Sequence, residues 1–204
     1  MNRKLFGKNL AVVLFLLGAG VVASCSEKIV GNPQKVAKEY IEAVQKGDFL
    51  ALYHLNRSTA RQSKYILSSD VGDVKKADAE NLARAKAGYD SVEPGFHPGS
   101  QWGEKYLFPA SAKVVIGKPR NPQLAAKDTF GDNYEKGNTV IVIVSASYPS
   151  AEQAPEYHGN KLKYAEYSCM LGKIRADKSV MIYTYDENWY FNGCFINSET
   201  AQYR

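Results

Sequence analysis

Apolar side chains recur with helical spacing over residues 33–46. The apolar stripe consists of Val36, Ala37, Tyr40, Ile41 and Val44. Oppositely charged residues lie four positions apart outside this stripe, which is typical of a helix with one buried and one solvated face. Asn32 and Pro33 supply an N-cap and a first helical residue, and Gly47 supplies the end. The pattern therefore predicts an amphipathic helix that begins at Pro33.

Two further helices are predicted. Asp48 caps a short one that runs from Phe49 to about Asn56 and depends on packing for its stability. The other covers residues 73–89, and its apolar arc consists of Val74, Ala77, Leu82, Ala85 and Tyr89. Because about half of this arc is alanine-sized, it buries little apolar area. We expect this helix to lie over other elements rather than to form the core.

From residue 112 onward the pattern changes to that of β-strands. The predicted strands cover residues 114–116, 139–148, 162–171, 180–185 and 189–196, with turns near 176–178 and 186–188 and a helix start at Asn121 and Pro122 between the first two. Both parities are apolar from Val140 to Val144, which predicts a strand covered on both faces there. The apolar parity switches near residues 164 and 165, which predicts a β-bulge. Helices followed by antiparallel strands indicate an α+β fold.

A loop rich in aromatic residues, glycine and proline separates the helices from the strands, at residues 90–112. Its aromatic side chains are Phe96, Trp102, Tyr106 and Phe108. Two interpretations stay open. The loop packs down on the sheet, or these four side chains form a ligand or partner surface.

The first 24 residues have the pattern of an export signal. A basic start precedes an uncharged apolar run over residues 10–23. A helix that crosses a bilayer needs about 20 apolar residues, and this run is shorter. The run ends in Val22, Ala23, Ser24 and Cys25, which resembles the bacterial lipobox. The alternative is a plain secretory signal, which leaves Cys25 as an unexplained thiol.

The resemblance to a lipobox implies cleavage before Cys25, a diacylglyceryl thioether on its sulfur, and an acyl chain such as palmitate on its new amino group. Two or more acyl chains hold a protein firmly to a bilayer. Residues 25–31 then form a lipidated tether. Ser26 directly follows the cysteine, at the position where an aspartate signals retention at the inner membrane. A serine there favours the periplasmic face of the outer membrane. The expected partners are therefore a lipid bilayer and an unknown protein or small molecule of the envelope.

The net charge of the chain falls once the export signal is removed. The whole chain of 204 residues carries 26 basic and 21 acidic residues, a net charge of +5. Three of the basic residues lie in the signal, so that residues 25–204 carry 23 basic and 21 acidic residues, a net charge of +2. This balance gives no support for a nucleic-acid partner. With 45% apolar and 23% charged residues, the remainder is typical of one folded domain.

Cys169 and Cys194 remain as a pair in a compartment where disulfides persist. In a simple meander of the predicted strands the two cysteines occupy the first and third strands, about 10 Å apart, beyond the reach of a disulfide. The sequence therefore does not decide whether Cys169 and Cys194 form a disulfide.

The segment from Pro33 to Leu55, with its Lys-Gly-Asp break between two amphipathic helices, resembles the opening of the nuclear transport factor 2-like superfamily. Trp189 matches the late strand tryptophan of small lipoproteins of that type. The resemblance implies N-terminal helices packed in a strongly curved antiparallel sheet, a cone with a pocket at its wide end. It places a single domain at residues 32–200 with an insertion at about 58–111, long enough to cover or fill the pocket.

Chemical motifs are sparse. His54, His97 and His158 are scattered without the spacing of metal ligands, and no phosphate-binding loop or nucleophile motif follows the signal. Glu156 and His158 share a loop, and Glu166 lies beside the predicted bulge, but neither predicts a site. We therefore expect no cofactor, no metal and no catalytic residue.

Three classes of function remain. The first is a non-catalytic, lipid-anchored module that binds an envelope protein or small ligand. The second is a pocket enzyme of the same fold, of the isomerase or dehydratase type, which needs a carboxylate or histidine in an enclosed apolar cavity. The third is a structural subunit of an envelope complex.

Overall fold

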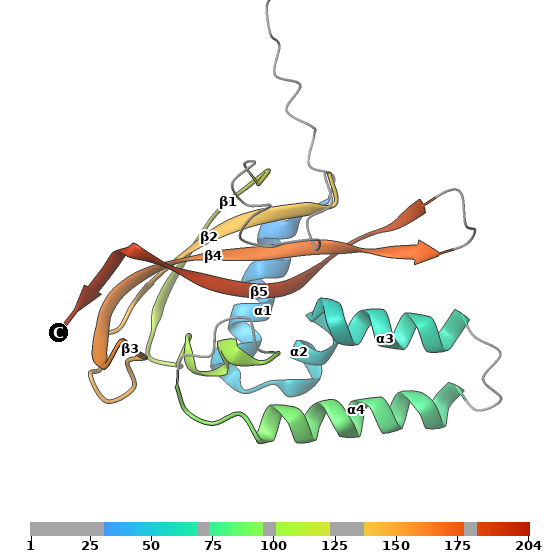
Figure 1. The fold of residues 1–204 in the computed structure, drawn as a ribbon, viewed down its shortest axis with the longest axis horizontal. Coiled ribbons are helices and arrows are strands. Elements are labelled where there is room, and N and C mark those ends of the chain that lie inside the picture. The colour runs from blue at the N-terminus through green and yellow to red at the C-terminus, as the bar shows by residue number, and fades with distance from the viewer. Residues whose placement is uncertain (1–30, 69–73, 96–100, 123–136, 178–182) are drawn as a thin grey trace, which may run out of the picture.

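The computed structural model describes residues 31–68, 74–95, 101–122, 137–177 and 183–204. The described elements are α1 (Pro33–Lys46), α2 (Phe49–Leu55), α3 (Arg57–Ser68), α4 (Val74–Asp90), the 3-10 helix η1 (Gly103–Tyr106), β1 (Lys113–Arg120), β2 (Thr139–Ser147), β3 (Glu156–Tyr157), β4 (Asn160–Asp177) and β5 (Tyr183–Tyr203). Helices precede an open antiparallel sheet, so the fold is α+β, as predicted (Figure 1).

The helix caps are formed as the sequence predicts. The Asn32 side chain accepts a hydrogen bond from Lys35 N at 2.9 Å, and Gly47 has a φ of 66°, a left-handed conformation that glycine adopts at little cost. Asp48 then accepts from Ala51 N at 3.1 Å and starts α2. These contacts confirm the first two helices.

Helix α3 is a correction, because the sequence analysis placed no helix after Asn56. The Asn56 Oδ1 atom accepts hydrogen bonds from Ser58 N at 3.0 Å and Thr59 N at 3.4 Å and so begins the new helix. Helix α4 matches the predicted one closely and packs beside α3 on the side away from the sheet (Figure 1). Most of the described residues of α4 are at least partly exposed, as its small apolar arc predicts, and Tyr89 is buried.

The sheet has the order β1-β2-β4-β3, and β5 pairs with the long strand β4. All these pairs are antiparallel. Residues on both parities of β2 are buried at its start, and the register of β4 against β5 shifts on either side of Tyr164, so both expectations for these strands are confirmed. Residues 123–136 lie outside the described chain, as does the helix predicted after Pro122.

Strand β5 corrects the predicted turn at residues 186–188. It runs without interruption from Tyr183 to Tyr203, and the pairing passes from Lys173↔Trp189 to Arg175↔Tyr185 through a register shift. The polar triplet at 186–188 is therefore an irregularity within one strand and not a turn between two. β4 ends at Asp177, beyond the start of the predicted turn at 176–178, and β5, which begins at Tyr183, is its direct neighbour in the sheet.

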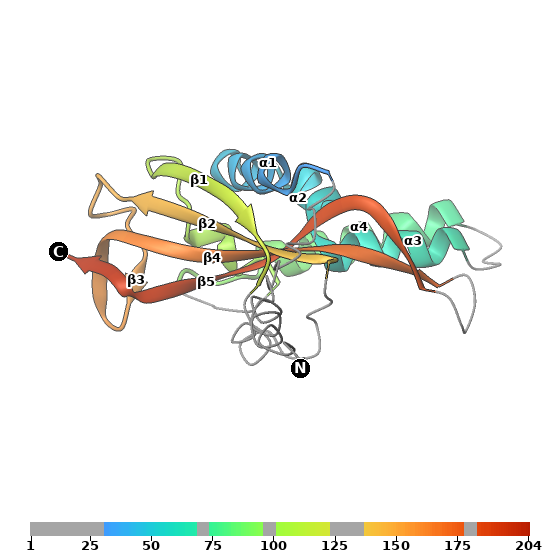
Figure 2. The ribbon, with the colours of Figure 1, turned by 90° about the horizontal axis from the view of Figure 1, so that it is seen from above.

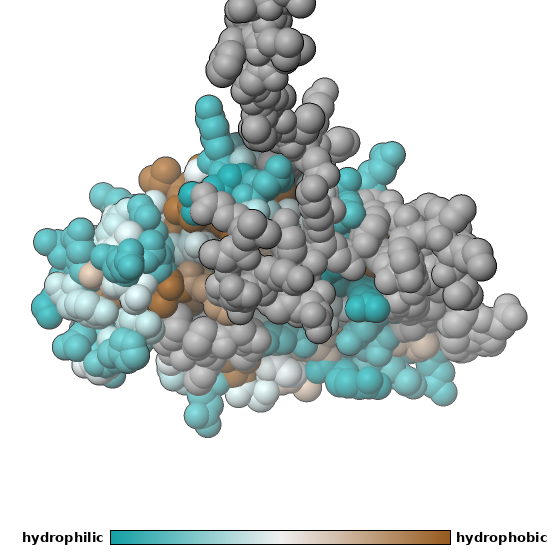
Figure 3. Space-filling view, turned by 45° about the horizontal axis from the view of Figure 1, so that its top comes forward, coloured by the Kyte–Doolittle hydropathy of each residue, from teal (hydrophilic) through white to brown (hydrophobic). Residues whose placement is uncertain are grey.

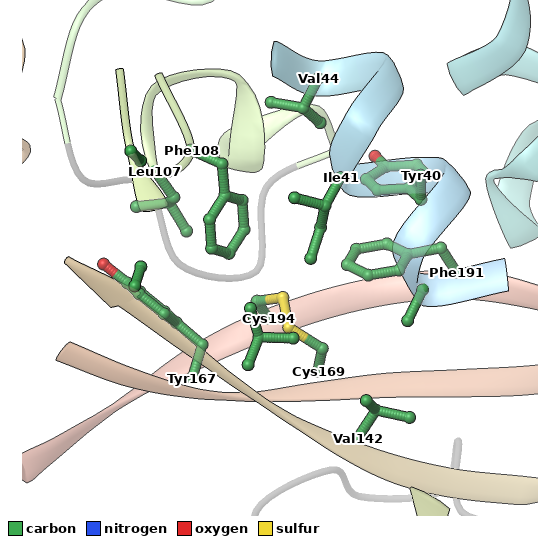
Figure 4. Close-up of a cluster of buried hydrophobic side chains, with 14 of the residues drawn as sticks. Tyr40, Ile41, Val44, Leu107, Phe108, Val142, Tyr167, Cys169, Phe191 and Cys194 are labelled. Carbon is green, nitrogen blue, oxygen red and sulfur yellow. A yellow bond between two sulfur atoms is a disulfide. The ribbon is translucent and has the colours of Figure 1, made fainter. Parts of the chain in front are cut away.

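The main core lies between α1 and the sheet. Ile41 and Val44 of α1 point toward Phe108, Val142 and Tyr167 (Figure 4). Tyr40 stacks on Phe191 of β5 with ring centres 3.8 Å apart and planes at 7°. Viewed from above, the strands lie over the helices, with α1 alongside β1 (Figure 2).

Candidate functional site

The structure joins Cys169 and Cys194 in a disulfide (Figure 4). Because β5 is one strand, Cys194 lies on the direct neighbour of the strand that carries Cys169, and the two residues are register partners with Cα atoms 4.0 Å apart. The separation of about 10 Å expected from a three-strand meander is therefore wrong. Both residues are buried, so the bond ties the two longest strands together inside the core.

Two of the four aromatic side chains of the loop, Trp102 and Phe108, pack into the core, so the interpretation of a ligand or partner surface does not hold for these two. Trp102 and Phe108 are 3% and 0% exposed. Trp102 meets Phe49 and Tyr89 edge-on, with ring centres 5.7 Å and 5.9 Å away. Such buried rings are unavailable to a partner. Tyr106 is half-buried, and Phe96 lies outside the described residues.

Two buried tyrosines fix the loop to the sheet. Tyr148 Oη donates to Leu107 O at 3.0 Å, and Tyr148 Oη lies 2.6 Å from Tyr167 Oη. A carbonyl only accepts, and a hydroxyl has one proton, so Tyr167 donates to Tyr148. Burial raises the pKa of Tyr167 to about 12 and that of Tyr148 further. Both hydroxyls therefore stay protonated and hold the loop in place.

The sequence analysis missed Glu104, which η1 places in the interior. Its side chain accepts a hydrogen bond from Cys194 N at 3.1 Å, and Glu104 is 5% exposed. Burial raises the pKa of this carboxyl to about 7, although hydrogen bonds from Cys194 N and Tyr40 act in the opposite direction. Its place between Trp102 and Tyr106, in a loop with several aromatic side chains, does not by itself indicate that the carboxyl is buried.

Glu104 belongs to a buried chain of hydrogen bonds. Asn56 uses its Oδ1 atom to cap α3, so its amide NH2 group donates to Tyr40. Tyr40 donates to Glu104, which also accepts from Cys194 N. The chain connects the start of α3, α1, η1 and β5. It satisfies the carboxyl within the protein, as buried polar groups require.

The residues weighed for catalysis lie apart from this cluster. Glu166 is half-buried on the opposite face of β4 from its neighbours Ala165 and Tyr167, and it accepts a hydrogen bond from Tyr164 Oη at 2.9 Å. His54 and His158 are exposed. His97 falls outside the described residues, and among those described no group of three potential metal ligands gathers.

A hollow formed by described residues lies where the aromatic loop faces β3. It has a volume of about 900 Å³ and is open to solvent. It is lined mainly by Lys105, Tyr106, Glu156, Tyr157, His158 and Lys161, together with three prolines. We call it the β3 hollow. The rings of Tyr157 and His158 lie 4.1 Å apart, and Lys161 lies 4.0 Å from Glu156, so the wall offers aromatic faces beside charges of both signs.

Comparison with known proteins gives no family: no family model, no curated protein and no solved structure matches the chain. In the described part of the chain, no helix is both long and apolar enough to cross a membrane.

Proposed function

We propose that this protein is an exported lipoprotein, held by an acylated Cys25 on the periplasmic face of the outer membrane, whose single domain binds an envelope protein or a small ligand. The proposal of an anchor is supported by the lipobox-like sequence from Val22 to Cys25 at the end of an apolar run. The proposal of a nuclear transport factor 2-like cone is supported by α1, Gly47 and α2, which form as the resemblance implies, and by the buried Trp189.

The β3 hollow carries the proposal of a binding role. It offers about 900 Å³ of open space with aromatic rings and charged groups at its wall, which is the composition of a recognition surface. The carboxyl with a strongly raised pKa, Glu104, lines neither this hollow nor the second one formed by described residues. The hollow that could bind a ligand therefore lacks the carboxyl that could move a proton. This separation favours a binding role over a catalytic one.

A pocket enzyme is the second candidate, and Glu104 is the observation that favours it. A carboxyl with a pKa of about 7 is suited to move a proton near neutral pH. Against this role, the hydrogen bonds from Tyr40 and Cys194 N already occupy the carboxyl. We therefore assign Glu104 a structural role, as the hydrogen-bond acceptor that joins η1 to α1 and β5.

The anchor is tested by Cys25→Ser. The variant is expected to leave the membrane fraction or to accumulate with its signal uncleaved, because no sulfur remains for the thioether. Fractionation and lipid labelling of the full chain measure this outcome, with Ser24→Ala as a matched control, since a small residue is kept there. Membrane partition and lipid labelling that persist in Cys25→Ser contradict the anchor.

Binding at the β3 hollow is tested by Tyr157→Ala. Fractions of envelope extract, separated into small molecules and proteins, are screened for those that shift the protein's NMR signals. Removal of a central aromatic contact is expected to weaken such binding about tenfold or more. Leu50→Ala, a change at a 53% exposed residue of α2, is the control and keeps full affinity. Equal binding by both variants contradicts a site at the hollow.

A further inference from the structure

The β1 edge of the sheet carries an unbalanced positive charge. Lys113, Lys118 and Arg120 are exposed on β1, and neither β1 nor its neighbour β2 contains an acidic residue. On α1, which packs beside β1, three lysines accompany only two glutamates, which lie within ion-pair distance of them. Together these three elements hold six basic and two acidic residues, although residues 25–204 have a net charge of only +2.

An exposed apolar side chain lies among these cations. Val115 is 68% exposed, whereas its neighbours Val114 and Ile116 pack against the core. On the face that Figure 3 shows, hydrophobic patches lie next to hydrophilic side chains (Figure 3). We call Lys113, Val115, Lys118 and Arg120 the basic edge.

A hollow of about 470 Å³ continues the basic edge across the sheet. Lys113, Lys163 and Arg204 contribute to its lining, and its lining contains no acidic side chain. It lies on the outer face, because Lys113, Ser147 and Tyr164 are register partners across β1, β2 and β4. The nearest acid along β4, Glu166, accepts hydrogen bonds from the hydroxyls of Tyr164 and Ser145, at 2.9 Å and 3.5 Å. Arg204 already donates to the carbonyl oxygens of Tyr148 and Pro149, so Lys113 and Lys163 are the cations that this hollow offers to a phosphate group.

The tether enters the domain beside Trp189 of β5, against which Gly31 lies, and the first turn of α1 then contacts β1. Gln34, on the first turn of α1, donates from Nε2 to Ile116 O at 3.1 Å. Seven peptide units connect Cys25 to Asn32, and at about 3.5 Å each they span at most about 25 Å. Strand β1, with eight residues, is also about 26 Å long. A lipid on Cys25 therefore keeps all of the basic edge within reach of the bilayer.

We propose that the basic edge docks on the anionic phospholipid surface that holds Cys25, with Lys113, Lys118 and Arg120 against lipid phosphates and Val115 in the interface. This inference rests on the proposed lipid anchor. A short tether raises the local concentration of the surface, so three cations are enough for docking. None of the four residues of the basic edge lines the β3 hollow, which lies where β3 pairs with the start of β4.

Docking is tested on the mature lipoprotein in vesicles. A fluorophore is attached to Val115→Cys, where the introduced thiol is the reactive one because Cys169 and Cys194 form a disulfide. Lipids with spin-labelled chains are expected to quench it in vesicles of phosphatidylcholine with phosphatidylglycerol, but not in phosphatidylcholine alone. The same label at Leu50→Cys on α2 is the matched position and stays unquenched. High salt is expected to abolish the quenching at Val115→Cys.

Charge variants test the cause. Changing Lys113, Lys118 and Arg120 to glutamine is expected to lower the ratio of docked to undocked protein about a hundredfold, since each basic residue near an anionic surface contributes a several-fold factor. The matched control changes Lys76, Arg84 and Lys86 of α4 to glutamine, which removes three charges from the helical side and leaves docking unchanged.

The outcomes separate this inference from the proposed anchor. Mass spectrometry of the same preparation shows whether Cys25 carries lipid. If the lipid is present and Val115→Cys is not quenched in anionic vesicles, or if the charge variant docks as well as the wild type, the docking surface is wrong and the anchor stands. If the lipid is absent, the anchor itself is wrong. Protection of the label by a co-purified protein instead of lipid also overturns the inference.

Discussion

Replacing Trp189 with alanine is expected to lower the free energy of unfolding by about 4 kcal/mol, within the range for truncation of a large buried aromatic side chain. Trp189 is 4% exposed. Its ring lies against Gly31, where a side chain would come within 3.0 Å of the indole nitrogen, and Lys173 Nζ lies 5.3 Å from the ring centre. The residue therefore connects β5 to the entry of the chain into α1, and its loss leaves a cavity there.

Denaturant unfolding followed by circular dichroism measures this loss. Val115→Ala is the control, because Val115 is 68% exposed and its change is expected to cost no more than about 0.5 kcal/mol. A change below about 1 kcal/mol for Trp189→Ala is incompatible with the packing of a large ring in a closed core.

Glu104→Gln is expected to remove a pH dependence of stability that amounts to about 3 kcal/mol. Burial raises the pKa of Glu104 to about 7 in the folded protein, from an ordinary value of 4.5. Below pH 4.5 the carboxyl is protonated in both the folded and the unfolded state. The group then does not lower the free energy of unfolding. Between pH 4.5 and 7 the unfolded chain releases the proton and the folded protein retains it. The free energy of unfolding therefore falls as pH rises, and it levels off above pH 7.

The comparison of wild type with Glu104→Gln isolates this effect, since all other groups titrate in both proteins. Glutamine keeps an oxygen that accepts from Cys194 N and carries no charge. The free energy of unfolding of the variant, measured relative to that of wild type, is expected to rise by about 3 kcal/mol between pH 4.5 and 8. Glu199→Gln, at an exposed residue, serves as the control. A constant difference across this range is the result that contradicts a buried, proton-retaining Glu104.

The first two helices could be predicted because their determinants are local. Asn32, Gly47 and Asp48 act on backbone atoms within three or four residues, and these short-range contacts are visible in the order of residues. The bulge near Tyr164 is also local, because the alternation of apolar residues must change where a strand gains a residue.

The course of β5 could not be predicted in the same way. The polar run at residues 186–188 has the composition of a turn, and only pairing with β4 over its whole length keeps it within a strand. The error carried over to Cys169 and Cys194, since one additional strand between them doubles their separation. Pairing with β4 decided both features, through Lys173↔Trp189 and Arg175↔Tyr185 for the polar run and through Cys169↔Cys194 for the disulfide.

In the candidate site, too, some features could be predicted from the sequence and others are decided by the fold. The sequence singled out the aromatic loop, but burial alone decides whether Trp102 and Phe108 face the core or a ligand, and both are buried. Glu104 had no local signal. Its character depends on Tyr40, Asn56 and Cys194, which are distant in sequence and meet only in the folded core.

By itself the sequence determined the α+β class and the capped helices, and it carries the lipobox-like motif on which the proposed anchor rests, because propensity, capping and a short linear motif act between neighbouring residues. The tertiary structure decided the disulfide, the buried carboxyl, the two hollows and the location of the positive charge. Each of these depends on which distant segments share a strand pair or a core, and the free energy of those contacts outweighs local preference.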